Sequence, residues 1–420
     1  MSNKKIFYSI VVSDILSDFG DTLYYLALMN YVLLLPNSNL ALSVITISEI
    51  LPILFKVFIG HHADRSTKKV EVIIFTQLFR FFLYAIVGFL VSFTPALWIV
   101  IVISFINLIS DLAGQLENGL YLPIEVQLIN DKEREQVFAS SQSISSTLNI
   151  IFKLSGAFLV TWISYQALAF VNSFTFLACA LFMYVIRPKL PISDGSTSTG
   201  TQNFENTVSS VKKAINYIRK IPNLTQFLLA ISCVNGLFSI TTPLIVSNIA
   251  CNRGFILFNS ATTISLSGVI VTITSILGNI VSTTFFKKIT LKTSILISAM
   301  SLPLLFITFV INNILLCFIV LACLGISSGM ITPKFYGFLM GSFPTEKLGV
   351  LTSSIGTIIQ LGTIASQVLF SLLIINTSTT TISWIYLSIS ILLIIYLQRT
   401  LKSNRERKFY HVFNFKLTKN

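Results

Sequence analysis

Long apolar runs, separated by short polar connections, recur along the whole chain. Twelve of them reach or approach the roughly 20 residues that an α-helix needs to cross a bilayer. We expect membrane helices at 7–35, 40–59, 70–91, 97–122, 138–162, 167–186, 223–249, 255–284, 291–311, 314–342, 348–375 and 382–398. Lipid offers backbone groups no hydrogen-bonding partner, so continuous runs of this length indicate helices instead of the alternating strands of a barrel. The pattern predicts an all-α polytopic membrane protein with 12 transmembrane helices.

The polar connections alternate in charge. Those at 36–39, 92–96, 163–166, 250–254, 312–313 and 376–381 hold a single basic residue, Arg253, whereas the other connections and both ends of the chain hold most of the 29 Lys and Arg residues. Cytoplasmic loops retain positive charge, so we expect both termini in the cytoplasm. The predicted location is the plasma membrane, which the chain crosses many times.

Composition narrows the classes of protein further. Hydrophobic residues make up 54% of the 420 positions, and the net charge is +13. The basic residues lie between the predicted spans, which indicates contact with anionic membrane lipids and not with nucleic acid. The five cysteines are scattered through apolar runs without the spacing of metal ligands, so we expect no metal and no cofactor.

The chain also falls into two similar halves. A charged turn followed by Ser140-Ser141 recurs as a charged turn followed by Ser353-Ser354, about half the chain further on. We expect an N-terminal six-helix bundle at 1–186 and a C-terminal one at 223–400. Between them, 187–222 is predicted to be a cytoplasmic linker with an amphipathic helix at 207–220, and 401–420 to be a basic cytoplasmic tail.

A charged motif follows the second apolar run. It consists of Gly60, Asp64, Arg65, Lys68 and Lys69, in what reads as a tight turn before the third run. The spacing resembles motif A of the major facilitator superfamily, and the resemblance implies two six-helix halves that work by alternating access. It also implies that Asp64 is a conformational latch that favours the outward-facing state.

Finer features resemble the macrolide-efflux branch of the drug:proton antiporters. They are Gly20-Asp21, Leu122-Pro123 with Glu133, and residues 217–224. The chain departs from the antiporter pattern because 97–122 contains no arginine and 138–162 has only Lys153 to Ala157 in place of a Gly-Pro-rich motif. The second copy of motif A, after 255–284, lacks its Asp-Arg pair, so we expect the latch on one side only.

Charged residues inside the predicted spans form the second constellation. Each costs roughly 2.5–3.5 kcal/mol to insert, so such residues are expected to face the bundle interior and to pair. All of the well-buried ones belong to the first half: Asp14, Asp18, Asp21, Glu49, Arg80, Asp111 and Lys153.

Each of these charges has an expected role. Asp14, Asp18 and Asp21 share one helix face, and their mutual repulsion predicts that at least one carries a proton near neutral pH. The best candidates for proton or cation binding are Asp21 and Glu49, then Asp111, with Asp18 and Asp14 behind them. Arg80 and Lys153 are expected to be counter-ions. The alternative is a static salt-bridge network that orders the bundle.

Candidate substrate-cavity residues are Tyr25 in the first half and Asn235 and Gln360 in the second. Acids facing apolar and neutral polar groups suit a lipophilic small molecule, either neutral or cationic, better than a sugar or an organic anion. No phosphate-binding loop and no catalytic cluster is present, so we expect neither ATP hydrolysis nor enzymatic activity.

The leading hypothesis is a monomeric, proton-coupled secondary exporter. The alternatives are an uncoupled or differently coupled transporter of a peptide, lipid or metabolite, and a non-transporting sensor or immunity protein on the same scaffold.

Overall fold

The computed structural model describes residues 3–36, 38–190, 221, 223–283, 289–342 and 348–417. Within these ranges the secondary structure is helical, without strands, which confirms the predicted fold class. Eleven helical stretches are long and apolar enough to cross a membrane. Helix α1 (Asn3–Val32), with 30 residues and a length of about 45 Å, is long enough to cross a membrane but is not among these eleven apolar stretches. It carries Asp14, Asp18 and Asp21.

The chain divides into two compact units. Unit 1 comprises Met1–Gly200 and Ile245–Val269. Besides α1 it contains α2 (Ser38–Arg65), α3 (Lys69–Leu90), α4 (Leu97–Leu128), α5 (Asp131–Trp162), α6 (Tyr165–Ile186) and the short helix η1 (Arg187–Lys189). Residues 245–269 join these helices in part through a hydrogen bond from Ser260 Oγ to Asn30 Oδ1 (2.7 Å).

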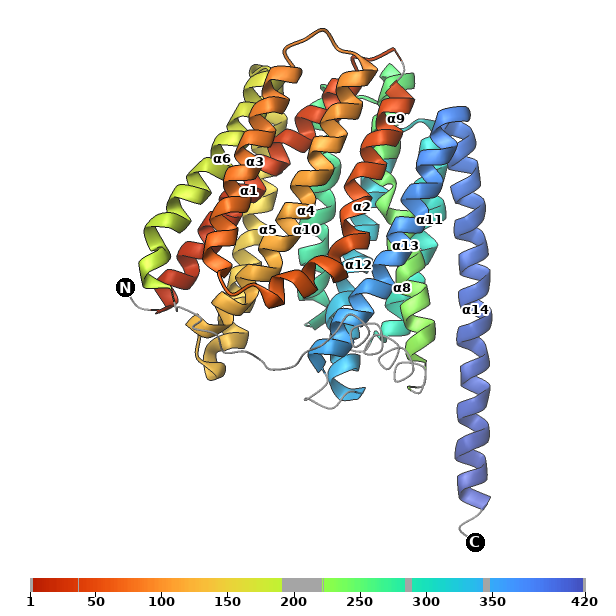
Figure 1. The fold of residues 1–420 in the computed structure, drawn as a ribbon. Helices are drawn as coiled ribbons and strands as arrows, with labels where there is room; N and C mark the ends of the chain where they lie inside the picture. The colour runs from red at the N-terminus through yellow and green to blue at the C-terminus, as the bar shows by residue number, and fades with distance from the viewer. Residues whose placement is uncertain are drawn as a thin grey trace. The chain divides into compact units, whose positions relative to one another are not determined.

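Unit 2 comprises Thr201–Leu244 and Ile270–Asn420. Its helices are α8 (Leu224–Ser239), α11 (Leu291–Ile311), α12 (Ile314–Ser342), α13 (Leu348–Asn376) and α14 (Thr379–Leu417). Two further helices are shared between the units, α9 (Thr241–Cys251) and α10 (Ser260–Thr283), with η2 (Arg253–Phe255) between them. Figure 1 shows the α-helices of both units, coloured along the chain from red to blue.

The helix pairings of the first half recur in the second. In unit 1, α1 packs on α5, α3 on α6 and α3 on α4. The corresponding pairs of unit 2 are α8 with α13, α11 with α14 and α11 with α12. The internal repeat that the serine pairs indicate is therefore present in the packing within each unit.

The α8–α13 pair depends on small residues. A Cβ at Gly362 would lie 2.1 Å from the backbone oxygen of Ser232, and a Cβ at Gly236 would lie 2.4 Å from the backbone oxygen of Gly362. Ser232 Oγ also accepts a hydrogen bond from the Gly362 backbone N–H (3.1 Å). Small residues of this kind let membrane helices approach until backbone meets backbone.

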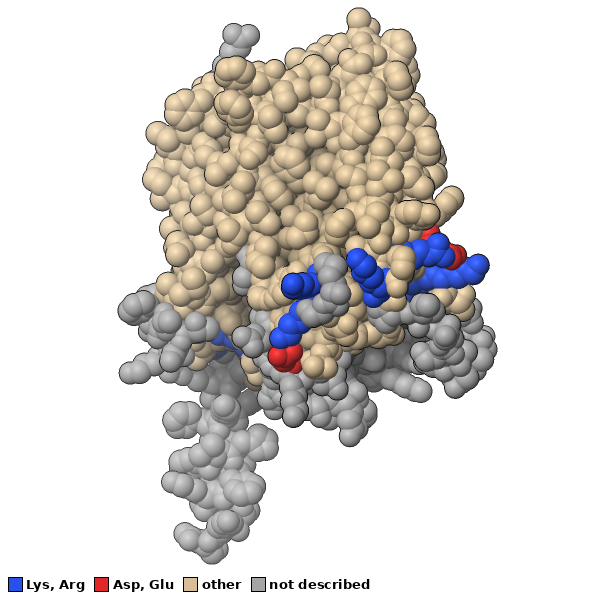
Figure 2. Space-filling view, turned by 90° about the vertical axis from the view of Figure 1, so that its left-hand side faces the viewer, with Lys and Arg blue, Asp and Glu red and all other residues tan. Residues whose placement is uncertain are grey.

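The outer surface of the helices is apolar over the width of a membrane. Figure 2 shows one face as a broad area without charge, bordered along one edge by Lys, Arg, Asp and Glu. Large apolar side chains such as Phe75, Phe82 and Phe105 are 62–68% exposed. Such a surface is stable only against lipid, which agrees with a multi-pass membrane protein.

Several predicted boundaries were wrong, because helices continue after the apolar run ends. Helix α2 runs to Arg65, so the motif expected as a tight turn from Gly60 to Lys69 is mostly helical, and only residues 66–68 connect α2 to α3. Helices α4 and α5 likewise extend to Leu128 and back to Asp131. The expected helix at 223–249 is divided at Ile240, and the basic tail continues α14 to Leu417. The predicted amphipathic helix at 207–220 lies outside the described residues.

Candidate functional site

The intramembrane charges of unit 1 converge on Arg80 of α3. Its Nη2 donates a hydrogen bond to Asp21 Oδ2 of α1 (2.9 Å), and its Nη1 lies 3.6 Å from Glu117 Oε2 of α4. Nε donates to Ser110 Oγ (2.9 Å), and the guanidinium carbon stands 3.9 Å from the ring centroid of Phe176. Only 5% of the Arg80 side chain is exposed, so one buried cation serves two carboxylates.

Asp21 is positioned by a close approach of α1 to α6. A Cβ at the preceding Gly20 would lie 2.3 Å from Thr175 Oγ1 and 2.4 Å from Asn172 Oδ1, so any larger residue here would displace these two side chains of α6. Asn172 Nδ2 then donates to Asp21 Oδ1 (3.3 Å). Each carboxylate oxygen of Asp21 therefore accepts one hydrogen bond, the other coming from Arg80.

A second polar group surrounds Asn107 of α4. Its Nδ2 donates to Glu49 Oε1 of α2 (3.0 Å) and to Asp111 Oδ2 (3.1 Å), while its Oδ1 accepts from the hydroxyl of Tyr84 (2.9 Å). One amide thus holds two carboxylates close together, and Tyr84 fixes which end of the amide faces them. The Tyr84 ring in turn packs against Tyr24 at 4.8 Å.

A cavity of about 310 Å³ adjoins both groups. Four carboxylates, one ammonium and three tyrosines contribute to its lining, and every lining side chain has a polar group. The lining residues are Asp18, Asp21, Thr22, Tyr24, Tyr25, Glu49, Tyr84, Asn107, Asp111, Asn149 and Lys153.

The structure brings most of the sequence-predicted charges of the first half together. Asp18, Asp21, Glu49, Asp111 and Lys153 all line this one cavity, together with the predicted Tyr25. Arg80 does not line the cavity but donates a hydrogen bond to Asp21, which does. Asp14, one turn before Asp18 on α1, is half-buried and does not line the cavity.

Sequence reasoning missed Glu117, which is 4% exposed and carries an oxygen without a hydrogen-bond partner. It also missed Asn107 and Ser110. These three residues, with Asp111 and Gly114, recur at helical spacing along 107–117. This polar stripe within an apolar helix is the signal that predicts an inward-facing line of site residues.

Of the two predicted substrate-cavity residues in unit 2, one lines a cavity and the other does not. Asn235 lines a separate cavity of about 210 Å³, together with Thr332, Phe335 and Tyr336. Gln360 is half-buried and does not line that cavity. Among the residues that the structure describes, no group of three or more His, Cys, Asp or Glu side chains could hold a metal ion.

Two lysines of the motif resembling motif A have structural partners in unit 1. Lys69 Nζ donates to the Ala63 carbonyl oxygen (2.9 Å) and so caps the last turn of α2, and Lys68 Nζ lies 3.7 Å from Glu71 Oε2. Gly60 sits inside α2, with nothing within 4 Å of a Cβ built on it. The side chains of Asp64 and Arg65 lie outside the described part, so the latch stays a prediction.

Comparison with known proteins places the fold in a family. The sequence profile of the Major Facilitator Superfamily matches residues 3–367, and the chain belongs to this superfamily. That membership makes it a transporter of small molecules and not an enzyme. No curated protein matches the sequence.

Solved transporter structures share the fold at low sequence identity. A variant of the nucleoside transporter NupG is 12% identical with a TM-score of 0.71, over 94% of this chain and 99% of that one. A POT family transporter in complex with 5-aminolevulinic acid is 12% identical with a TM-score of 0.68, over 94% and 95%. The POT family transporter PepTSo is also 12% identical, with a TM-score of 0.68, over 95% and 98%. At this identity the likeness supports the fold alone.

Proposed function

We propose that the protein is a secondary active transporter that exports an organic cation from the cell in exchange for protons, by alternating access of its two halves. The observation that carries the proposal is the charge of the cavity in unit 1. Four carboxylates line it against the single ammonium of Lys153, and Arg80 behind it already serves Asp21 and Glu117.

An excess of carboxylates in a site of low dielectric constant favours binding of positive charge. Glu49 and Asp111 share one amide donor group, and like charges so close repel. Either protons or a cationic substrate relieves the repulsion. Because both neutralise the same carboxylates, each displaces the other, and such competition is the physical basis of exchange.

The residues that line the cavity also define the chemical class of the substrate more closely than the sequence, which predicts a lipophilic compound. Tyr24 and Tyr84 are buried against each other, so Tyr25 is the lining tyrosine with exposed surface, and its ring attracts an organic cation by roughly 0.5–2 kcal/mol. Phe79 and Phe82 on α3 are exposed and do not line this cavity. We therefore expect a substrate with a cationic amine and an aromatic or aliphatic body.

Other features of the proposal rest on the sequence. The distribution of basic residues supports a location in the plasma membrane with both termini on the cytoplasmic side. The resemblance to the macrolide-efflux branch supports export. Asp64 is proposed as the latch of the outward-facing state.

A screen of cells that express the protein, grown against a panel of lipophilic amines, lipophilic anions and neutral toxins, tests the proposal. We expect resistance to a subset of the amines only, and its loss in an Asp21→Asn variant made in equal amount in the membrane. Resistance to neutral compounds or anions, retained by Asp21→Asn, would contradict the assignment. Transport that persists after collapse of the proton gradient would indicate a facilitator, and binding without flux in proteoliposomes a sensor.

A further inference from the structure

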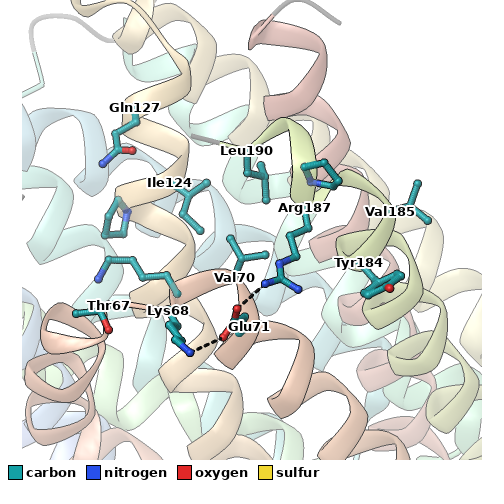
Figure 3. A pocket seen from close by; sticks show the side chains of 13 residues that line it. Thr67, Lys68, Val70, Glu71, Ile124, Gln127, Tyr184, Val185, Arg187 and Leu190 are labelled. Atoms are coloured by element: carbon teal, nitrogen blue, oxygen red, sulfur yellow. Dashed lines mark hydrogen bonds and ion pairs between the residues drawn. The ribbon is translucent and has the colours of Figure 1, made fainter. Parts of the chain in front are cut away.

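A second, larger cavity lies at the charged edge of unit 1. It measures about 620 Å³, within the range of small-molecule sites, and opens where α3 begins, α4 ends and α6 passes into η1. Its lining includes Lys68, Lys69, Glu71, Tyr184 and Arg187 (Figure 3). None of these residues lines the acidic cavity described above.

The charges at this cavity are mainly basic. Glu71 is the one acid among the lining residues, against Lys68, Lys69 and Arg187. Arg187 Nη2 lies 2.5 Å from Glu71 Oε1, and Lys68 Nζ lies 3.7 Å from Glu71 Oε2. Figure 3 shows both cations reaching the same carboxylate. The side chains of this trio are 41–75% exposed, and exposed ion pairs contribute only about 0–1 kcal/mol. An anion from outside can therefore compete with Glu71.

Apart from Thr67 and Gln127, the remaining lining residues are apolar or aromatic, and those on α6 continue onto the outer surface of the helices. Ile124 and Leu190 are buried at 4% and 5% exposure, while Tyr184 and Val185 on α6 are 63% and 66% exposed. The charged border in Figure 2 lies directly below the broad uncharged area. The cavity thus joins a basic edge, at the depth of lipid headgroups, to a surface that contacts acyl chains.

We propose that this cavity binds one anionic phospholipid, with the phosphate between Lys68 and Arg187 and an acyl chain along Tyr184 and Val185. A guanidinium binds a phosphate diester through paired, charge-assisted hydrogen bonds, which are stronger than those to neutral acceptors. Basic pockets between transmembrane helices offer this combination to lipid headgroups. A free phosphate would meet the same cations but would leave the apolar wall uncovered. The site does not depend on the substrate or on coupling.

Native mass spectrometry of the purified full-length protein, titrated with phosphatidylglycerol or phosphatidylcholine in detergent, tests this. The wild type should retain one phosphatidylglycerol in preference to phosphatidylcholine. Arg187→Gln with Lys68→Gln should weaken that binding by about 10-fold, because each basic group near a lipid surface contributes several-fold. Glu71→Gln should strengthen it, because Lys68 and Arg187 lose their internal competitor.

The matched control is Lys189→Gln. Lys189 is exposed on the same short helix as Arg187 but does not line the cavity, so its loss should change binding far less. The opposite signs expected for Glu71→Gln and for the double variant Arg187→Gln with Lys68→Gln separate lipid binding from simple unfolding. Equal weakening by both, equal retention of phosphatidylcholine, or full displacement of the lipid by glycerol phosphate at equal concentration would each overturn the proposal.

Discussion

Arg80 on α3 donates a hydrogen bond to Asp21 on α1 across 2.9 Å, inside a helix bundle where a charge is costly. The same guanidinium lies 3.6 Å from Glu117, which does not line the acidic cavity. Asp21, with 36% of its side chain exposed, is therefore the more accessible partner of this cation, and Glu117, with 5% exposed, is the buried one. If a proton or substrate neutralises Asp21, as the proposed function requires, we expect Arg80 to pair with Glu117 instead, so that the site alternates between two charge arrangements.

Loss of the Arg80 cation should destabilise the protein. Arg80→Gln leaves Asp21 and Glu117 without their cation, and breaking a buried pair from one side costs about 3–5 kcal/mol. Arg80→Lys keeps the charge but loses the Nε bond to Ser110 and the planar contact with Phe176, so its effect should be intermediate. Melting temperatures in detergent measure this. An Arg80→Gln variant as stable as the wild type would mean that the network is not structural.

Glu117→Gln should slow transport without weakening substrate binding. Arg80 then keeps Asp21 as its only acidic partner, so one of the two charge arrangements is favoured throughout the cycle. We expect kcat to fall by about 10-fold, equivalent to ~1.4 kcal/mol in the barrier, with the substrate Kd unchanged. Transport rates and equilibrium binding, measured separately, show the difference. A lower affinity with an unchanged kcat would place Glu117 in the substrate site instead.

Much of the fold could be predicted because the membrane imposes a simple length rule. The expected spans 291–311 and 314–342 have the same bounds as α11 and α12, where apolar runs end at caps such as Asn312 in left-handed conformation. The C-terminal end of helix α2 could not be predicted in this way. Hydropathy measures the apolar stretch, whereas the helix continues through polar residues to Arg65.

The site was predictable only in part, for a related reason. Intramembrane charge marks Asp21, Glu49 and Asp111 individually, because each is costly wherever it stands. The roles of Asn107 and Glu117 depend on partners 30 or more residues away, such as Glu49 and Arg80. The polar stripe along 107–117 marks these residues as inward-facing, but the identity of their partners follows from how the helices pack.

Tyr84→Phe should reduce substrate affinity. The hydroxyl of Tyr84 donates to Asn107 Oδ1 and so keeps the amide N–H groups directed at Glu49 and Asp111. Without it we expect KM to rise by about 3- to 10-fold, in line with the 0.5–1.5 kcal/mol of one hydrogen bond. The control is Tyr386→Phe, which removes a hydroxyl bonded to the Ser366 carbonyl in unit 2. If both variants raise KM equally, the effect is not specific to the acidic cavity.

Gly362→Ala should separate α8 from α13 and lower the melting temperature. The new Cβ would stand 2.1 Å from the Ser232 backbone oxygen, which cannot move without its helix. Gly356→Ala on the same helix is the matched control, because nothing lies within 4 Å of its Cβ. That control should be neutral or slightly stabilising, since alanine favours a helix over glycine by about 0.5–1 kcal/mol. Equal melting temperatures for the two variants would show that α13 repacks freely.

The central claim is that the carboxylates of unit 1 exchange protons for a cationic substrate. The most direct measurement is proton movement in proteoliposomes that enclose a pH-sensitive dye, after a substrate amine from the growth screen is added outside. The wild type should move protons against the substrate flux, and Asp21→Asn and Glu49→Gln should abolish that movement while remaining folded. Substrate flux without proton movement in the wild type, or full coupling in both variants, would contradict the account.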